Sequence, residues 1–343
     1  VGLAKKPMIV VPNNLVNQWG NEIKRAYPAA RILLSRKVDF KPANRRRFLS
    51  RIATGNWDVV VVPYSHFGLI PIEPETFNEF LEKEIAAYVE ELAQLRVDAG
   101  KKPPAVKELE NLIASLRAKL KNTGDQRKDA QVPTFERLGV DMLVVDEAHN
   151  FKRLMTPTKM TRVAGVPTGP GSKRAFDLYI KGQWMNRAYK TGGTVFLTGT
   201  PISNTIGEMH VLLRYLAMPE LEARGLERFD AWAATFAEKV TDVEVSPTGR
   251  GFRSKTRFAK FTNVPELNQL YHAVADVKLQ KDLSLPIPRI KGGAPEMAIV
   301  EATPELTRYV DELLERYNAV MGQSQTRPKP DPTEDNPLKI VGD

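Results

Sequence analysis

Two adjacent carboxylates stand directly after a short apolar segment near the middle of the chain. Residues 142–145 are apolar and predict a buried strand, and Asp146 and Glu147 follow it at once. Hydrolysis of a nucleotide needs a hydrated cation on the phosphates and a group that orients the attacking water. We therefore expect Asp146 to hold Mg²⁺ through water and Glu147 to activate the water. The alternative is an exposed acidic turn without a chemical role.

Hydroxyl side chains follow a second apolar run. Residues 195–197 predict another buried strand, and Thr198, Gly199 and Thr200 come next. In open α/β sheets the chemistry lies beyond the carboxyl ends of the strands, so these hydroxyls are expected to bond the Asp–Glu pair. The alternative is an ordinary turn into a helix, for which Thr205 and Glu208 supply a capping-box pattern.

A third candidate site follows the first apolar run, residues 8–11. Asn13, Asn14 and Asn17 follow this run and its Pro12. Apolar residues at helical spacing predict a helix here, and they are Leu15, Trp19, Ile23 and Tyr27. A helix N-terminus is a natural phosphate site, so a nucleic-acid backbone contact is expected here. Simple capping of the helix by either asparagine is the alternative.

These segments belong to a regular alternation of strands and helices. Further strands are predicted at 31–34 and at 59–62, where four valines stand in a row. Runs that are apolar on both faces are typical of parallel sheets covered by helices. The pattern predicts an α/β lobe with helices on both faces of a parallel sheet.

Residues 73–131 interrupt this alternation and predict an inserted antiparallel helical hairpin. Thr76 and Glu79 form a capping-box pattern, and a break at 99–104 separates two apolar stripes. The stripes comprise Phe77, Leu81, Ile85, Val89 and Leu92, and then Val106, Leu109, Ile113, Leu116 and Leu120. They either pack the two helices together or form a surface for a partner or DNA.

The chain changes character after residue 216. Residues 240–245 and 252–258 predict a β-hairpin, and helices are expected at 264–276 and 303–320. The segment from 323 is rich in Pro, Asp and Lys and predicts a flexible tail.

Composition narrows the class of protein. The net charge is +9, which favours a polyanionic partner such as nucleic acid. Cysteine is absent and the four histidines lack metal-ligand spacing, so disulfides are excluded and a zinc site is not expected. No apolar run is long enough to span a bilayer, and we expect a cytoplasmic protein without a membrane partner.

The phosphate-binding sequence GxxxxGK[ST] does not occur in the chain. Gly169 to Lys173 resembles it only in part and follows the acidic pair. Because the chain begins with Val, we expect it to be a piece of a longer protein whose phosphate loop lies upstream.

Three segments resemble Swi/Snf-type translocases of helicase superfamily two. IVVPNNLVNQWGNE is similar to their motif Ia region, VVDEAHNFKR to motif II, and FLTGTPISNTIGEMHVLLRYL to motif III and the helix after it. The whole chain is also similar to the helicase segment of large phage- and plasmid-borne polypeptides that often carry an adenine-specific DNA methylase.

This resemblance implies a RecA-like lobe that binds ATP and Mg²⁺. It implies that Asp146 coordinates Mg²⁺, that Glu147 activates water, and that Thr198 and Thr200 couple hydrolysis to duplex DNA. It further implies DNA contacts near Asn13 and Leu15, and that His149 links the nucleotide site to motif III.

The resemblance also predicts how the chain is divided. Residues 1–222 form part of the first motor lobe without its phosphate loop, 223–322 connect toward a second lobe, and 323–343 are the tail or the start of that lobe. Since the phosphate loop and the arginine fingers of the second lobe are missing, the chain alone is expected to hydrolyse little ATP.

Two other functions are compatible with the residues. One is a non-enzymatic DNA-binding or scaffolding module with vestigial motor motifs, which the basic residues Arg45 to Arg47 and the segment 250–260 favour. A DEAD-box-like RNA helicase shares the chemistry, but those enzymes usually carry Ser-Ala-Thr where this chain has Thr-Gly-Thr-Pro.

Overall fold

A computed structural model describes most of the chain. The described residues are 3–98, 104–123, 132–156, 158, 160, 163–164, 166, 171–189, 193–203, 205–245, 252–279, 282–283, 297–298 and 300–320. Contacts divide the chain into two units, Val1–Val240 with Thr256–Ala275, and Thr241–Lys255 with Asp276–Asp343.

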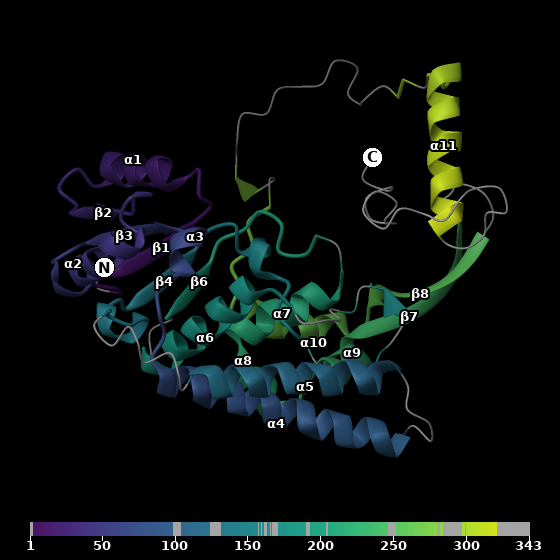
Figure 1. The fold of residues 1–343 in the computed structure, drawn as a ribbon, viewed down its shortest axis with the longest axis horizontal. Coiled ribbons are helices and arrows are strands. Elements are labelled where there is room, and N and C mark those ends of the chain that lie inside the picture. Colours follow the sequence, from purple (N-terminus) through teal and green to yellow (C-terminus); the bar gives the residue numbers. More distant parts are fainter. Residues whose placement is uncertain are drawn as a thin grey trace. The chain divides into compact units, whose positions relative to one another are not determined.

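A five-stranded parallel sheet forms the centre of the first unit (Figure 1). Its order is β2-β3-β1-β4-β6. The strands are β1 (Pro7–Val11), β2 (Ile32–Leu34), β3 (Val59–Pro63), β4 (Met142–Val145) and β6 (Thr194–Phe196). In the register, Val10 lies beside both Val62 and Val145, so the carboxyl ends of β1, β3 and β4 lie at one edge of the sheet.

Helices cover both faces of this sheet. On one face α1 (Val16–Ala26) packs on Ile9, Val11 and Val61. The other face, with Met8 and Val10, packs on a larger core. The helices that surround that core include α2 (Pro42–Thr54), the short α3 (Tyr64–Phe67), α6 (Lys173–Ala188) and α7 (Gly207–Leu216). The expected α/β, RecA-like sheet flanked by helices is therefore confirmed.

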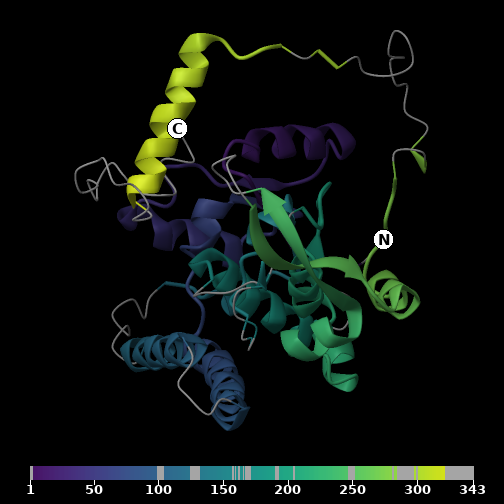
Figure 2. The ribbon, with the colours of Figure 1, turned by 90° about the vertical axis from the view of Figure 1, so that its right-hand side faces the viewer.

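The predicted helical hairpin is also present. Helices α4 (Pro74–Asp98) and α5 (Pro104–Thr123) lie side by side (Figures 1 and 2). The buried stripe includes Leu81, Ile85, Leu92, Val106, Leu109, Ile113 and Leu116, together with Tyr88. Most of the apolar stripe is therefore buried where the two helices pack together, although Val89 is exposed.

The Thr76–Glu79 capping box is wrong. Helix α4 already begins at Pro74, and the Glu79 carboxylate accepts a hydrogen bond from Arg187 at 2.6 Å instead. An ion pair with another helix has replaced the local cap.

A second core lies around the helices that follow α7. Helices α8 (Met218–Ala223), α9 (Phe229–Phe236) and α10 (Val264–His272) bury Trp232 and Phe229. Strands β5 (Val163–Ala164), β7 (Ala237–Val245) and β8 (Phe252–Phe261) form a sheet of order β5-β8-β7. The two arms of the predicted hairpin are therefore neighbours, and their connecting turn lies outside the described residues.

In the second unit, α11 (Pro304–Val320) agrees with the expected helix at 303–320. The tail from 323 lies outside the described residues. The boundaries proposed at residues 222 and 322 stay predictions.

The stability of this core depends on pH through His210 of α7. It is fully buried between Phe229 and Trp232, and its Nε2 lies 3.3 Å from the Leu226 carbonyl oxygen. Burial, and then the nearby Arg214, lower the pKa of His210 to about 3. Below the ordinary histidine pKa of about 6.5 the unfolded chain gains a proton that the native state excludes, so stability falls as pH drops toward 3.

We expect the free energy of unfolding to lose about 2 kcal/mol between pH 7 and pH 5 through this residue. His210→Gln should flatten that dependence in denaturant titrations at the two pH values. His272→Gln, at an exposed position on α10, should leave it unchanged. Equal pH dependence in His210→Gln and in the unaltered protein would contradict the assignment.

Candidate functional site at the carboxyl edge of the sheet

The acidic pair lies where the ends of three strands are tied together. The Asp146 amide donates to the Val10 carbonyl at 2.9 Å, and the Leu197 amide donates to Val145 at 2.9 Å. The Ala148 amide in turn donates to Leu197 at 3.0 Å. These backbone bonds fix the tip of β4 between the ends of β1 and β6.

The Asp146 carboxylate accepts two hydrogen bonds. Its Oδ1 accepts from the Glu147 amide at 3.0 Å, and its Oδ2 accepts from the indole Nε1 of Trp19 at 2.9 Å. Each carboxylate oxygen keeps a further acceptor position, because an ionised carboxylate has about four. The group therefore fits a hydrated Mg²⁺, which takes one or two carboxylates and keeps its waters.

Glu147 has a left-handed backbone, with φ 47° and ψ 48°, which is uncommon for a residue other than glycine. Its carbonyl accepts hydrogen bonds from the Tyr64 hydroxyl at 3.2 Å and from Asn150 Nδ2 at 3.0 Å. Tyr64 also donates to the Asp146 carbonyl. Such strain persists where the surroundings impose it, and it concentrates at functional sites.

The Tyr64 hydroxyl stays protonated at neutral pH. Burial is the largest cause that raises the pKa of Tyr64, to about 12. The hydroxyl thus stays a donor to the two carbonyls at neutral pH.

His149 joins the acidic pair to the threonines. Its Nδ1 lies 3.2 Å from Glu147 Oε2, 3.1 Å from Thr198 Oγ1 and 3.4 Å from Thr200 Oγ1. One ring nitrogen carries either one proton or one lone pair, so these three oxygens share a single hydrogen-bonding position. The residues predicted from two separate segments are therefore in contact.

A second polar cluster steadies the segment that carries the threonines. Glu208 accepts hydrogen bonds from the Ser203 amide at 2.7 Å and pairs with Lys152 Nζ at 2.9 Å. Helix α7 begins at Gly207 without a side-chain cap, so the predicted Thr205–Glu208 capping box is wrong. Sequence reasoning missed this role of Lys152.

The predicted nucleic-acid contacts lie at the same edge. Helix α1 begins at Val16 without a side-chain cap, so capping by Asn13 or Asn14 is wrong. Asn13 Oδ1 instead accepts from the Ser65 amide at 3.3 Å. Both asparagines are exposed and Leu15 is half-buried, so a ligand can reach them.

A small pocket opens beside these residues. It has a volume of about 310 Å³ and is lined by Pro12, Asn13, Tyr64, Ser65, Asn150 and Arg174. The Arg174 guanidinium lies over the rings of Tyr64 and Phe151, at 5.4 and 5.1 Å from their centroids. Sequence reasoning did not find Arg174, since no motif marks it.

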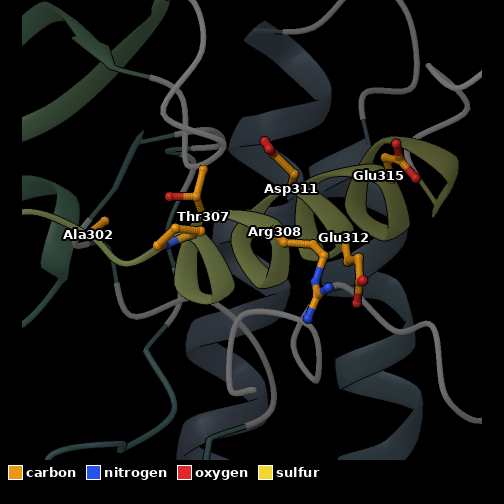
Figure 3. A pocket seen from close by; sticks show the side chains of 7 residues that line it. Ala302, Thr307, Arg308, Asp311, Glu312 and Glu315 are labelled. Atoms are coloured by element: carbon orange, nitrogen blue, oxygen red, sulfur yellow. The ribbon is translucent and has the colours of Figure 1, made fainter.

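Two other hollows lie away from this edge. One, of about 710 Å³, is mainly apolar and lies beside the end of α1 and the start of β3. The other, of about 560 Å³, lies along α11 in the second unit, where the side chains of Arg308 and Glu312 lie beside each other and Asp311 points away from them (Figure 3). Neither contains a predicted site residue.

The fold and the edge site define a RecA-like α/β lobe with an acidic pair at the end of an inner strand. The model of a family described as "probable helicase domain" matches residues 1–279, and the chain belongs to that family. In the described residues no helix is long and apolar enough to cross a membrane.

The chain is also similar to the Defense against restriction protein B of Escherichia phage P1. The two are 22% identical over 237 residues, which cover 68% of this chain and 10% of that protein. The chain thus spans about a tenth of the length of the relative that it matches. The family and this relative indicate a helicase-related protein.

Proposed function

We propose that this chain is the larger part of the first motor lobe of a Swi/Snf-type, DNA-dependent ATPase. The intact protein couples ATP hydrolysis to movement along duplex DNA. The observation that carries the proposal is the chain of contacts from Glu147 through His149 to Thr198 and Thr200 at the carboxyl edge of the sheet.

In this proposal each edge residue has one task. Asp146 holds Mg²⁺ through water, and that ion neutralises charge on the triphosphate. Glu147 orients the attacking water and accepts its proton. His149 relates the position of the Glu147 carboxylate to Thr198 and Thr200, which couple the nucleotide state to motion.

The strand order is compatible with a phosphate loop carried on a further strand. Strand β6 lies at the end of the strand order, beside β4, so one more parallel strand can add at its outer edge. A loop after such a strand would face the acidic pair, because the carboxyl ends of parallel strands share an edge.

Duplex DNA is the proposed polymer, and a second motor lobe of the same polypeptide is the proposed partner. Asn13, Asn14 and Leu15 contact the DNA backbone, supported by Arg174 in the neighbouring pocket. The intact protein also carries an adenine methylase in this proposal, because the chain is similar to the helicase segment of phage- and plasmid-borne polypeptides that often carry one.

The test uses the intact protein that contains this chain. ATP hydrolysis is measured alone, with duplex DNA and with RNA, and we expect the largest stimulation with duplex DNA. Stimulation by RNA alone would favour an RNA helicase. Salt-dependent DNA binding without any hydrolysis would favour the scaffolding module.

A further inference from the structure

Trp19 connects the predicted nucleic-acid contacts to the predicted Mg²⁺ ligand. Its backbone amide donates to Leu15 at 2.9 Å, one helical turn back, and its indole donates to Asp146 Oδ2 at 2.9 Å. One turn of α1 and one hydrogen bond therefore separate the segment at Asn13 from the Asp146 carboxylate. A shift of the start of α1 changes how that carboxylate is held.

A second connection reaches Glu147 from the pocket. Tyr64 and Asn150 both line the pocket, and both side chains donate to the Glu147 carbonyl, which also accepts from the Asn150 amide at 3.0 Å. Arg174 stacks on Tyr64 and donates from Nη2 to the Asn150 carbonyl at 2.9 Å. The cation in the pocket thus contacts the Tyr64 ring and the Asn150 backbone, and these two residues are the ones whose side chains donate to the Glu147 carbonyl.

The chemistry of the pocket favours a singly charged phosphodiester. It offers one guanidinium together with the amide and hydroxyl groups of Asn13, Ser65 and Asn150. An anion beside Arg174 would compete with the Asn150 carbonyl for the guanidinium, because charge-assisted hydrogen bonds are the stronger ones. The two donors on the Glu147 carbonyl would then rearrange.

We propose that Trp19 and Tyr64 are positioning residues that make the acidic pair respond to a nucleic-acid phosphate at the start of α1 and in the adjoining pocket. The inference rests on the proposed function. Trp19 orients the Asp146 side chain, and Tyr64 sets the Glu147 backbone. Neither touches the reacting atoms.

Conservative variants of the intact protein test this. Trp19→Phe removes only the indole donor, and Tyr64→Phe removes only the hydroxyl. The control for Trp19→Phe is Trp57→Phe, because the Trp57 indole also donates a hydrogen bond, to the Arg51 carbonyl. Trp57 stands just before β3 and therefore at the opposite edge of the sheet. The control for Tyr64→Phe is Tyr88→Phe, inside the helical hairpin.

Two readouts separate positioning from simple support of the fold. The affinity for Mn²⁺ is measured by electron paramagnetic resonance with a non-hydrolysable ATP analogue, and we expect Trp19→Phe to weaken it about tenfold. ATP hydrolysis is measured across DNA concentrations, and Tyr64→Phe is expected to lower the DNA-stimulated kcat about tenfold. Both variants should have the same DNA affinity, KM for ATP and melting temperature as their controls.

The outcomes distinguish the inference from the proposed function. If the unaltered protein hydrolyses ATP with DNA, but Trp19→Phe and Tyr64→Phe behave like their controls, the inference is overturned and the function stands. If the unaltered protein hydrolyses no ATP with DNA, both are overturned. Equal losses in the variants and in their controls also overturn the inference, since they indicate general destabilisation.

Discussion

Glu147→Gln in the intact protein should lower kcat for ATP hydrolysis by about 10²–10⁴-fold, the usual contribution of a general base. Glutamine has the shape of glutamate but cannot accept the proton of the attacking water. The backbone of residue 147 is held through its carbonyl by Tyr64 and Asn150, so the substitution leaves that geometry in place. ATP binding should persist, and steady-state hydrolysis together with nucleotide binding measures both.

Two variants make this result specific. Glu266→Gln, at a half-buried position on α10 where the carboxylate pairs with Arg224, should leave hydrolysis unchanged. Asp146→Asn should raise the Mg²⁺ concentration needed for half-maximal hydrolysis and should also lower kcat, because this carboxylate is assigned to the cation. A Glu147→Gln protein that keeps most of its hydrolysis would remove Glu147 from the chemistry.

The sheet was predictable because its signal is local. Four consecutive valines at 59–62 satisfy burial on both faces, and the structure places Val60 and Val62 in one core and Val59 and Val61 in the other. A segment with that composition has few other stable environments. The stripes of the helical hairpin were predictable for the same reason.

Helix ends were predicted poorly, and the reason is competition for side chains. Asn13 accepts from the Ser65 amide, Glu79 pairs with Arg187, and Glu208 binds Ser203 and Lys152. In each case a partner distant in sequence, or a loop amide, took the group that the local pattern assigned to a cap. Short capping patterns cannot reveal such partners.

Sequence patterns predicted which residues follow the strands, but not the contacts between side chains that are distant in sequence. Asp146, Glu147 and the two threonines follow strands, so their shared edge follows from a parallel sheet. Trp19 satisfied the sequence pattern as one apolar residue of a helix, and it does pack on that face. Its hydrogen bond to Asp146 depends on the placement of α1 over the sheet, which periodicity does not specify.

The helical hairpin is joined to the lobe by ion pairs along one helix. On α4, Glu79 pairs with Arg187, Lys83 with Glu222, and Glu84 with Arg214. The first two pairs are exposed and are expected to contribute little. The Glu84–Arg214 pair is different, because both side chains are buried.

Arg214→Met should therefore lower the free energy of unfolding by about 3–5 kcal/mol, since it leaves the Glu84 carboxylate buried without its cation. The guanidinium donates to Glu84 at 2.9 Å and to the Met155 carbonyl at 2.8 Å. Burial is the largest single influence and opposes the charge, but Glu84 together with Tyr179 and Tyr88 raises the pKa of Arg214 above its ordinary value. The melting temperature should fall by about 10 °C.

The double variant Glu84→Met with Arg214→Met separates the pair from its surroundings. Because replacement of a buried ion pair by apolar side chains is often neutral, the double variant should recover most of the stability lost in either single variant. Lys83→Met, which breaks an exposed pair on the same helix, should change the free energy of unfolding by less than about 0.5 kcal/mol. If the two single losses simply add in the double variant, Glu84 and Arg214 do not act as a pair. Recovery would show that the two groups act as a pair and that the pair adds little net stability over apolar side chains of similar size.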